Sequence, residues 1–105
     1  METEQLRGQL EGTQLIDVRE DDEWAQGHIG GAVHLPMDEI EDRMSEVSTE
    51  NPIVTVCRSG QRSGEVAKQL RERGLDAENL EGGVQAWVDA GHELVDEDGA
   101  RGRVA

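Results

Sequence analysis

The sequence predicts an α/β domain with a mostly parallel sheet. Two observations carry this prediction. Short apolar runs rich in β-branched residues, of which Ile53–Val56 is the clearest, indicate buried strands. Between such runs lie segments whose apolar residues recur at helical spacing, as at Val66, Ala67 and Leu70. Strands that alternate with helices favour parallel pairing, because a helix carries the chain back across the sheet.

The only cysteine, Cys57, follows the strand predicted at Ile53–Val56. A small-residue loop then leads into a helix that we expect to end at Gly74. Backbone N–H groups of such a loop converge on one point, and the helix N-terminus adds partial positive charge there. Arg58 and Arg62 add two full charges. The pattern therefore predicts a thiolate nucleophile beside an anion site, although a lone cysteine is also compatible with a small buried core residue.

The N-terminal half predicts two helices around one strand. Residues 3–11 indicate a short amphipathic helix with Thr3 as its N-cap. Leu15–Val18 indicates a second buried strand. The acidic cluster at 20–23 is suited to the first turn of a short helix, which we expect to carry Trp24 inward.

The middle of the chain is less regular. Ala32–Leu35 indicates a short strand that Pro36 closes, because proline donates no backbone hydrogen bond. Met37–Val47 has apolar residues at helical spacing and predicts either one helix or two short ones.

The C-terminal part predicts one more strand and one more helix. The strand is expected at Ala77–Leu80, and the helix at 84–91, with Val84, Trp87 and Val88 on its inner face. From residue 96 onward the sequence has no period and little apolar content. We therefore expect a domain over 1–95 and a mobile acidic tail over 96–105.

Composition limits the possible functions. The chain of 105 residues suits one domain, and its 24 acidic against 10 basic residues give a net charge of −14. This charge disfavours nucleic acid and anionic membranes as partners. The balance of many acids against a single lysine is typical of a salt-accumulating halophile, although an acidic mesophilic protein remains an alternative. A single thiol, with no secretory signal and no long apolar run, predicts a cytoplasmic, monomeric protein.

Three stretches, in order and in register, resemble the single-domain rhodanese-like sulfurtransferases. They are 15–36, which contains Asp17-Val18-Arg19 and Gly27-His28-Ile29, then Cys57–Ser63, then Asn79–Trp87 with its Gly-Gly pair. Together they lie within residues 13–91. The resemblance implies the rhodanese-like fold, with a sheet of four or five strands and helices on both faces.

The resemblance implies transfer of a sulfane sulfur. In this family the cysteine takes sulfur from a donor such as thiosulfate, becomes a persulfide, and passes the outer sulfur to cyanide, a thiol or a sulfur-carrier protein. Cys57 matches the nucleophile, and the loop after it matches the substrate cradle. The residues of that loop are Arg58, Ser59, Gly60, Gln61, Arg62 and Ser63. The family needs no metal and no redox cofactor, and an anion cradle beside a thiolate agrees with that chemistry.

Other residues of the matching stretches are assigned structural roles. We expect Asp17 and Arg19 to form an ion pair near the site, and His28 to be a satisfied structural histidine. The three histidines are not clustered, which disfavours a metal site. Related phosphatases carry arginine six positions after the cysteine, where this chain has Ser63, so the shorter loop favours sulfur over phosphate chemistry.

Three functions stay open from the sequence. The first is a thiosulfate or persulfide sulfurtransferase. The second is a sulfur-relay protein that takes sulfur from one protein and delivers it to another. The third is a non-catalytic rhodanese-like interaction module, which the intact cysteine and its two arginines disfavour.

Overall fold

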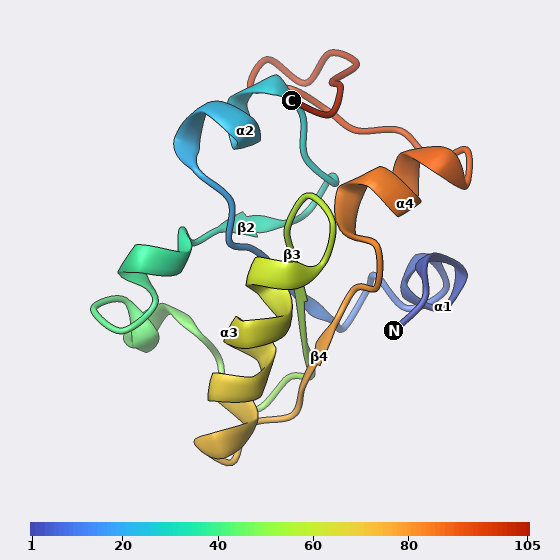
Figure 1. The fold of residues 1–105 in the computed structure, drawn as a ribbon. Helices are drawn as coiled ribbons and strands as arrows, with labels where there is room; N and C mark the ends of the chain where they lie inside the picture. Colours follow the sequence, from blue (N-terminus) through green and yellow to red (C-terminus); the bar gives the residue numbers. More distant parts are fainter.

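The computed structural model describes all residues from 1 to 105, and four parallel strands form its sheet (Figure 1). The spatial order is β2-β1-β3-β4, so β3 is an interior strand. The strands are β1 (Gln14–Asp17), β2 (Val33–His34), β3 (Ile53–Val56) and β4 (Ala77–Asn79). The predicted α/β fold with a parallel sheet is confirmed, with four strands.

Helices cover both faces of this sheet. They are α1 (Thr3–Arg7), α2 (Asp21–Gln26), α3 (Gln61–Glu72) and α4 (Gly83–Asp89), with two 3₁₀ turns, η1 (Met37–Glu39) and η2 (Met44–Glu46). The 3₁₀ turns and α3 lie on one face, and α1 and α4 lie on the other (Figure 1). Helix α2 lies beyond the carboxyl ends of the strands, at the top of Figure 1.

Side chains along β3 alternate between the two faces, as the pleat of a strand requires. Ile53 belongs to the apolar cluster that contains Leu70 of α3. Val54 belongs to the opposite cluster, with Leu6 of α1 and Trp87 of α4. All five of these side chains are buried, and each fully buried aliphatic side chain contributes about 1.5–3 kcal/mol. The interior strand that carries Cys57 is therefore anchored from both sides.

Several predicted boundaries are wrong. The first helix ends at Arg7 and not at residue 11, because Gly8 is a poor helix former, and Thr3 is its first helical residue and not its N-cap. Strand β3 has the predicted bounds, whereas the other three strands shift or shorten by one or two residues. Trp24 is half-buried, stacks on His28 with ring centroids 3.5 Å apart, and lies outside both core clusters, so its inward placement is only partial. Val88 is 37% exposed and does not share the inner face of α4.

The segment 37–47 forms the two short helices of the alternative prediction, with 3₁₀ geometry. The helical spacing of its apolar residues correctly identified the buried side, because Met37, Ile40, Met44 and Val47 all pack in the cluster beneath α3. The spacing did not distinguish one long α-helix from two single turns.

The last residues lie against the domain. Val95 and His28 exchange two backbone hydrogen bonds of 2.8 Å, one in each direction. Further along, the Arg58 guanidinium donates to the carbonyl of Ala105 at 3.2 Å. These contacts place residue 105 beside the loop after β3. The mobility of 96–105 stays a prediction. No helix of the chain has the length and apolar character to cross a membrane.

Candidate functional site

Cys57 lies at the carboxyl end of the interior strand, where the chain turns into α3. It is a free cysteine and only 1% exposed. In open parallel sheets, ligands bind beyond the carboxyl ends of the strands, so this placement agrees with the predicted site.

Two short contacts hold the Cys57 sulfur. The backbone N–H of Gly60 donates to Sγ at 3.0 Å, and the Ser63 hydroxyl lies 3.2 Å from it. Burial alone raises the pKa of the Cys57 thiol. Hydrogen bonds from the Ser63 hydroxyl and from the backbone of Ser63, Gly60 and Ser59 outweigh burial and hold that pKa below its usual range. These contacts therefore stabilise the Cys57 thiolate relative to that of a free cysteine.

The backbone donors of the loop around the sulfur have no backbone acceptors, and those of Ser59, Gly60 and Ser63 contact the sulfur. Five of its N–H groups donate to no backbone carbonyl, namely those of Arg58, Ser59, Gln61, Arg62 and Ser63. Gly60 has φ +104°, a conformation that side chains other than glycine rarely adopt, and this turns the loop back over the sulfur. The start of α3 adds its partial positive charge. The loop can therefore bind an anion next to Cys57.

Helix α4 fixes the backbone of Cys57 from the side. The N–H of Val84 donates to the Cys57 carbonyl at 2.9 Å. A Cβ placed on Gly83 would lie 2.2 Å from the same carbonyl oxygen, so only glycine permits this approach. The Gly-Gly pair at the start of α4 thus holds the Cys57 backbone in place.

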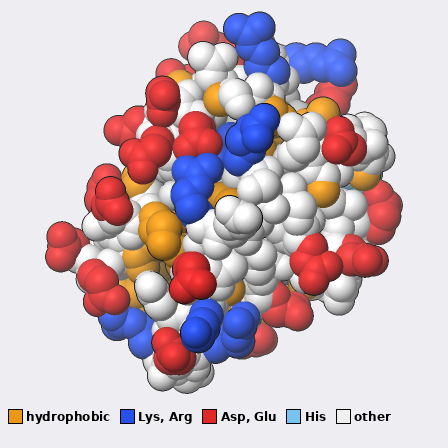
Figure 2. Space-filling view, in the orientation of Figure 1, with side chains coloured by type: hydrophobic (Ala, Val, Ile, Leu, Met, Phe, Trp, Pro, Cys, Tyr) orange, Lys and Arg blue, Asp and Glu red, His pale blue; other side chains and the backbone are white.

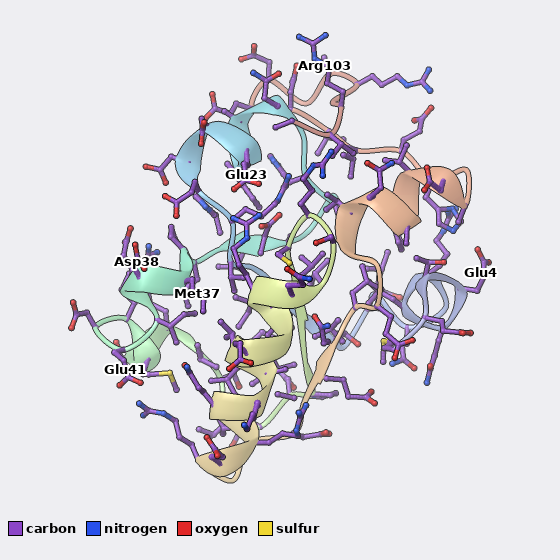
Figure 3. All side chains as sticks on the ribbon, viewed as in Figure 1. Glu4, Glu23, Met37, Asp38, Glu41 and Arg103 are labelled. Carbon is purple, nitrogen blue, oxygen red and sulfur yellow. The ribbon has the colours of Figure 1, made fainter.

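Arg62 is already paired with a carboxylate. Its two terminal nitrogens donate to the two oxygens of Glu23, at 2.7 and 2.9 Å. These hydrogen bonds lower the pKa of Glu23 from 4.5 to about 2, against the effect of burial. Figure 3 labels Glu23 between α2 and the loop that precedes α3. The charge of Arg62 is therefore largely balanced before any substrate arrives.

Most of the other loop side chains face solvent. Arg58, Ser59 and Gln61 are exposed, and the exception is Ser63, which is fully buried. Figure 2 shows a few basic side chains in the middle of this face with acidic side chains around them. The positive charge at the mouth of the site is therefore local and lies within an acidic surface.

Asp17 and Arg19 form a completely buried ion pair, with Nη2 and Oδ2 2.8 Å apart. Arg19 also donates to the carbonyl of Gly27 at 2.7 Å. Asp17 is aligned with Val56, the residue before Cys57, in the β1–β3 register. The pair connects β1 with the turn after α2, and neither side chain hydrogen-bonds the Cys57 sulfur.

The histidines are engaged in structural contacts. His28 Nδ1 lies 2.9 Å from the carbonyl of Trp24, and His34 Nε2 lies 2.7 Å from the carbonyl of Arg19. Both rings stack on Trp24. No three His, Cys, Asp or Glu side chains converge in an arrangement that suits a metal ion.

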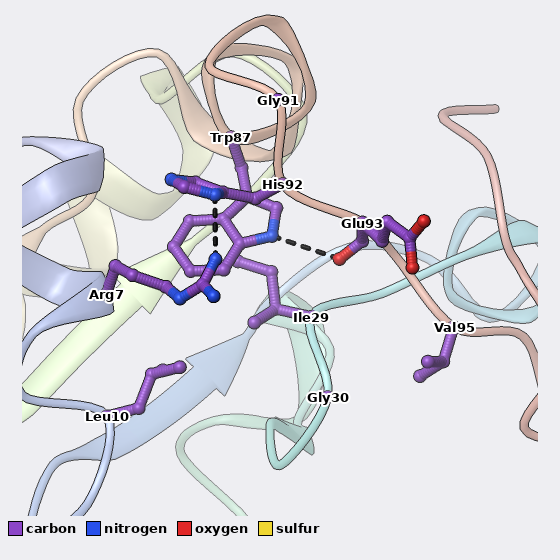
Figure 4. Close-up of a pocket in the computed structure, with 9 residues that line it drawn as sticks. All are labelled: Arg7, Leu10, Ile29, Gly30, Trp87, Gly91, His92, Glu93 and Val95. Carbon is purple, nitrogen blue, oxygen red and sulfur yellow. Dashed lines mark hydrogen bonds between the residues drawn. The ribbon is translucent and has the colours of Figure 1, made fainter.

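The largest surface hollow lies elsewhere. It has a volume of about 500 Å³ and lies between α1, α4 and the turn at Gly30 (Figure 4). His92 forms one wall, accepts from Arg7 at 2.8 Å through Nδ1, and contacts Glu4 at 2.9 Å through Nε2. None of the three hollows is lined by Cys57 or by residues 58–63. The Cys57 side chain is thus buried and opens into none of these hollows.

Two site residues had no predicted role. Glu23 pairs with Arg62 from 39 positions away, and Asn79 contacts both Gly60 and Ser63. In the sequence, Glu23 is one acid of a cluster within the first matching stretch, and Asn79 is part of the third. The sequence does not show that Glu23 and Asn79 lie next to the loop after β3 in the folded chain.

Comparison with known proteins agrees with this geometry. The model of the family described as "Rhodanese-like domain" matches residues 2–90. The chain belongs to the rhodanese-like family. Among solved structures, a rhodanese-related protein from Thermoplasma volcanium superposes with a TM-score of 0.88 at 26% identity, over 92% of this chain and 97% of that one. The rhodanese-like fold expected from the resemblance is confirmed.

Rhodanese-like relatives indicate the chemistry. A protein named "Sulfurtransferase" from Allochromatium vinosum is 38% identical over 103 residues, which is 94% of this chain and 96% of that protein. The "Thiosulfate sulfurtransferase GlpE" of Pseudomonas aeruginosa is 33% identical over 80% of this chain and 78% of its own length. These similarities support sulfur transfer in general for this rhodanese-like chain.

Proposed function

We propose that this protein is a thiosulfate sulfurtransferase that acts through a Cys57 persulfide. The observation that carries the proposal is the sulfur at the centre of a loop with five backbone N–H groups free of backbone acceptors. The same loop donates to Sγ from Gly60 and lies next to Ser63. Such a loop stabilises a thiolate and receives an oxyanion at the same place.

The first step is a displacement on thiosulfate. The Cys57 thiolate attacks the outer sulfur, a new S–S bond forms, the S–S bond of thiosulfate breaks, and sulfite leaves with the electron pair. The loop N–H groups are placed to hold the sulfonate oxygens during this step. Since Cys57 is 1% exposed and lines none of the three surface hollows, a donor with a protruding terminal sulfur fits the approach.

The second step returns the thiolate. A nucleophilic acceptor, such as cyanide or a thiolate, attacks the outer sulfur of the persulfide. The S–S bond to Cys57 breaks, and the electron pair goes back to Sγ. The hydrogen bonds that lower the pKa of Cys57 also make it a good leaving group.

A direct test is the intact mass of the protein after thiosulfate and then after cyanide, in molar KCl. We expect a gain of one sulfur atom per chain and its loss as thiocyanate. The Cys57→Ser variant should show neither change, and its circular dichroism should match that of the wild type. A folded wild type that takes up no sulfur from thiosulfate would overturn the thiosulfate assignment.

A sulfur relay from a persulfide donor is the second candidate, and one observation favours it. Arg62 is paired with Glu23, so of the two loop arginines only Arg58 offers a dianion a charge that no acidic side chain balances. Loading from a low-molecular-weight persulfide, compared with loading from thiosulfate at equal concentration, separates the two. Fast loading from the persulfide alone would favour the relay, in which a thiol or a sulfur-carrier protein is the acceptor.

The non-catalytic module has less support. A binding module has no need of a buried thiol with two close donors, yet Cys57 has both. A folded protein that takes up sulfur from neither thiosulfate nor the low-molecular-weight persulfide would favour the non-catalytic module.

A further inference from the structure

The Ser63 hydroxyl lies between two acceptors. One is Cys57 Sγ at 3.2 Å, and the other is the side-chain oxygen of Asn79, within hydrogen-bond distance. A hydroxyl carries one proton and can donate it to one acceptor at a time. Ser63 and Cys57 are both almost completely buried, so water does not replace either contact. The Ser63 hydroxyl therefore donates its proton either to Cys57 Sγ or to Asn79 Oδ1, but not to both at once.

The orientation of the Asn79 amide is fixed. Its NH₂ group donates to the carbonyl of Gly60 at 2.9 Å, which leaves Oδ1 facing Ser63. A flipped amide would place its oxygen against the Gly60 carbonyl and its NH₂ group against the Ser63 hydroxyl. Asn79 therefore acts on Ser63 as an acceptor only.

Close contacts with neighbouring residues restrict the positions of the Asn79 amide and of Ser63. A Cβ added to Gly64 of α3 would lie 3.4 Å from the Asn79 amide nitrogen, so helix and amide are in close contact. On the other side, the Thr55 hydroxyl donates to the Ser63 carbonyl at 2.8 Å. Ser63 and Asn79 thus stay in place, and only the hydroxyl proton turns.

We propose that Asn79 is a positioning residue that holds the Ser63 proton whenever Sγ is uncharged and releases it when Sγ becomes a thiolate. A thiolate is a stronger acceptor than a neutral amide oxygen, because a charged partner shortens and strengthens a hydrogen bond. A thiol sulfur, or the inner sulfur of a persulfide, is a weak acceptor. The hydroxyl then donates to Asn79 and is never left buried without a partner.

This proposal rests on the proposed function, since it assigns Asn79 a part in the exchange between thiolate and persulfide. The proposal predicts a kinetic difference that would not arise if Asn79 only supported the conformation of the loop. Asn79→Leu removes the acceptor at nearly constant side-chain size, which destabilises the thiol and the persulfide but not the thiolate. Sulfur loading should slow and sulfur discharge should not, whereas a distorted loop would slow both.

The experiment measures the two half-reactions separately by stopped flow, at a pH where Cys57 is fully ionised. For Asn79→Leu we expect loading from thiosulfate to slow by about three- to tenfold, the range of one ordinary hydrogen bond, and discharge to cyanide to stay equal or rise. When Ser63 is already alanine, Asn79→Leu should change neither the loading rate nor the discharge rate. Asn51→Leu, at an exposed asparagine before β3, is the matched control.

A second readout needs no sulfur donor. The pH midpoint of Cys57 alkylation by iodoacetamide should fall in Asn79→Leu and should not move when Ser63 is already alanine. Asn79→Ala also removes the acceptor without adding a charge, should lower the midpoint in the same Ser63-dependent way, and serves if the leucine variant does not fold.

The outcomes separate the two claims. Equal slowing of loading and discharge, or the same alkylation shift with and without the Ser63 hydroxyl, would overturn the role of Asn79. Absence of loading in the wild type, with the alkylation shifts as expected, would count against the proposed function and leave the Ser63–Asn79 exchange supported.

Discussion

The Glu23–Arg62 ion pair gives the sharpest test of the electrostatics at the site, through the substitution Glu23→Gln. Arg62 lowers the pKa of Glu23 from 4.5 to about 2. Each pKa unit corresponds to about 1.4 kcal/mol, so the pair stabilises the fold by at most about 3 kcal/mol. The Arg62 side chain is 37% exposed, and solvent screening reduces the expected loss in Glu23→Gln to about 1–2 kcal/mol.

The loss should depend on pH in a defined direction. The pKa of Glu23 is lower in the folded state than in the unfolded state, so its stabilisation is complete above about pH 4.5. It decreases as the pH falls towards about 2, because the carboxylate becomes protonated. Glutamine does not titrate, so the difference between wild type and variant should vanish in that range.

Urea unfolding, followed by tryptophan fluorescence from about pH 6 to about pH 2, measures this difference. Glu41→Gln is the matched control. Glu41 pairs with Arg73, but both side chains are largely exposed, so we expect a loss below about 0.5 kcal/mol. The reasoning fails if the Glu23→Gln difference stays constant down to about pH 2, or if it is no larger than that of the control.

The same pair predicts a kinetic effect. Glu23→Gln frees the charge of Arg62 and should lower the KM for thiosulfate, whereas Arg62→Ala should raise it by about tenfold and raise the pKa of Cys57. Arg62→Ala also leaves the Glu23 carboxylate without its partner. The double variant isolates the loss of the arginine itself, and a KM equal to that of the wild type would show that the backbone N–H groups suffice.

Three further predictions concern the thiol, the loop and the charge of the whole chain. Ser63→Ala removes a donor to Cys57, so the pH midpoint of alkylation should rise and sulfur uptake at neutral pH should fall by about tenfold; an unmoved midpoint would contradict this. Gly83→Ala forces a Cβ against the Cys57 carbonyl and should cost about 3 kcal/mol or more in urea unfolding. Gly74→Ala, where φ is also positive but the space is open, should cost only about 1–2 kcal/mol, and equal losses would argue against the clash. The halophile interpretation predicts a higher Tm in molar KCl than in dilute buffer, and equal values would remove it.

The sequence alone was enough to predict the parts of the site that are close together along the chain. A strand end, a glycine loop and a helix start occupy consecutive positions, so the contacts of Cys57 with Gly60 and Ser63 follow from local geometry. Glu23 and Asn79 reach the site from other elements. The number of residues that separates Glu23 or Asn79 from Cys57 in the sequence does not reveal that their side chains contact the loop in the fold.

The segment 37–47 shows a different reason for an incomplete prediction. Its apolar spacing reports which side of the chain is buried, and that much was right. An α-helix and a pair of 3₁₀ turns bury nearly the same residues, so the pattern does not separate them. Likewise, the predicted free charge of Arg62 ignored that a chain with 24 acids offers partners to most of its arginines.

The balance of charge around Cys57 leads to one last prediction. A protein of net charge −14 repels a dianion at long range, and the ion pair with Glu23 leaves Arg62 little power to oppose this. Salt screens that repulsion, since the Debye length shrinks from about 10 Å at 0.1 M to about 3 Å at 1 M, while hydrogen bonds to the loop act at shorter distances. Loading from thiosulfate should therefore become faster as salt increases over this range. Alkylation by neutral iodoacetamide is the control and should change little. Potassium glutamate at equal ionic strength detects competition by chloride, and a loading rate that falls in both salts would show that steering by positive charge governs the site.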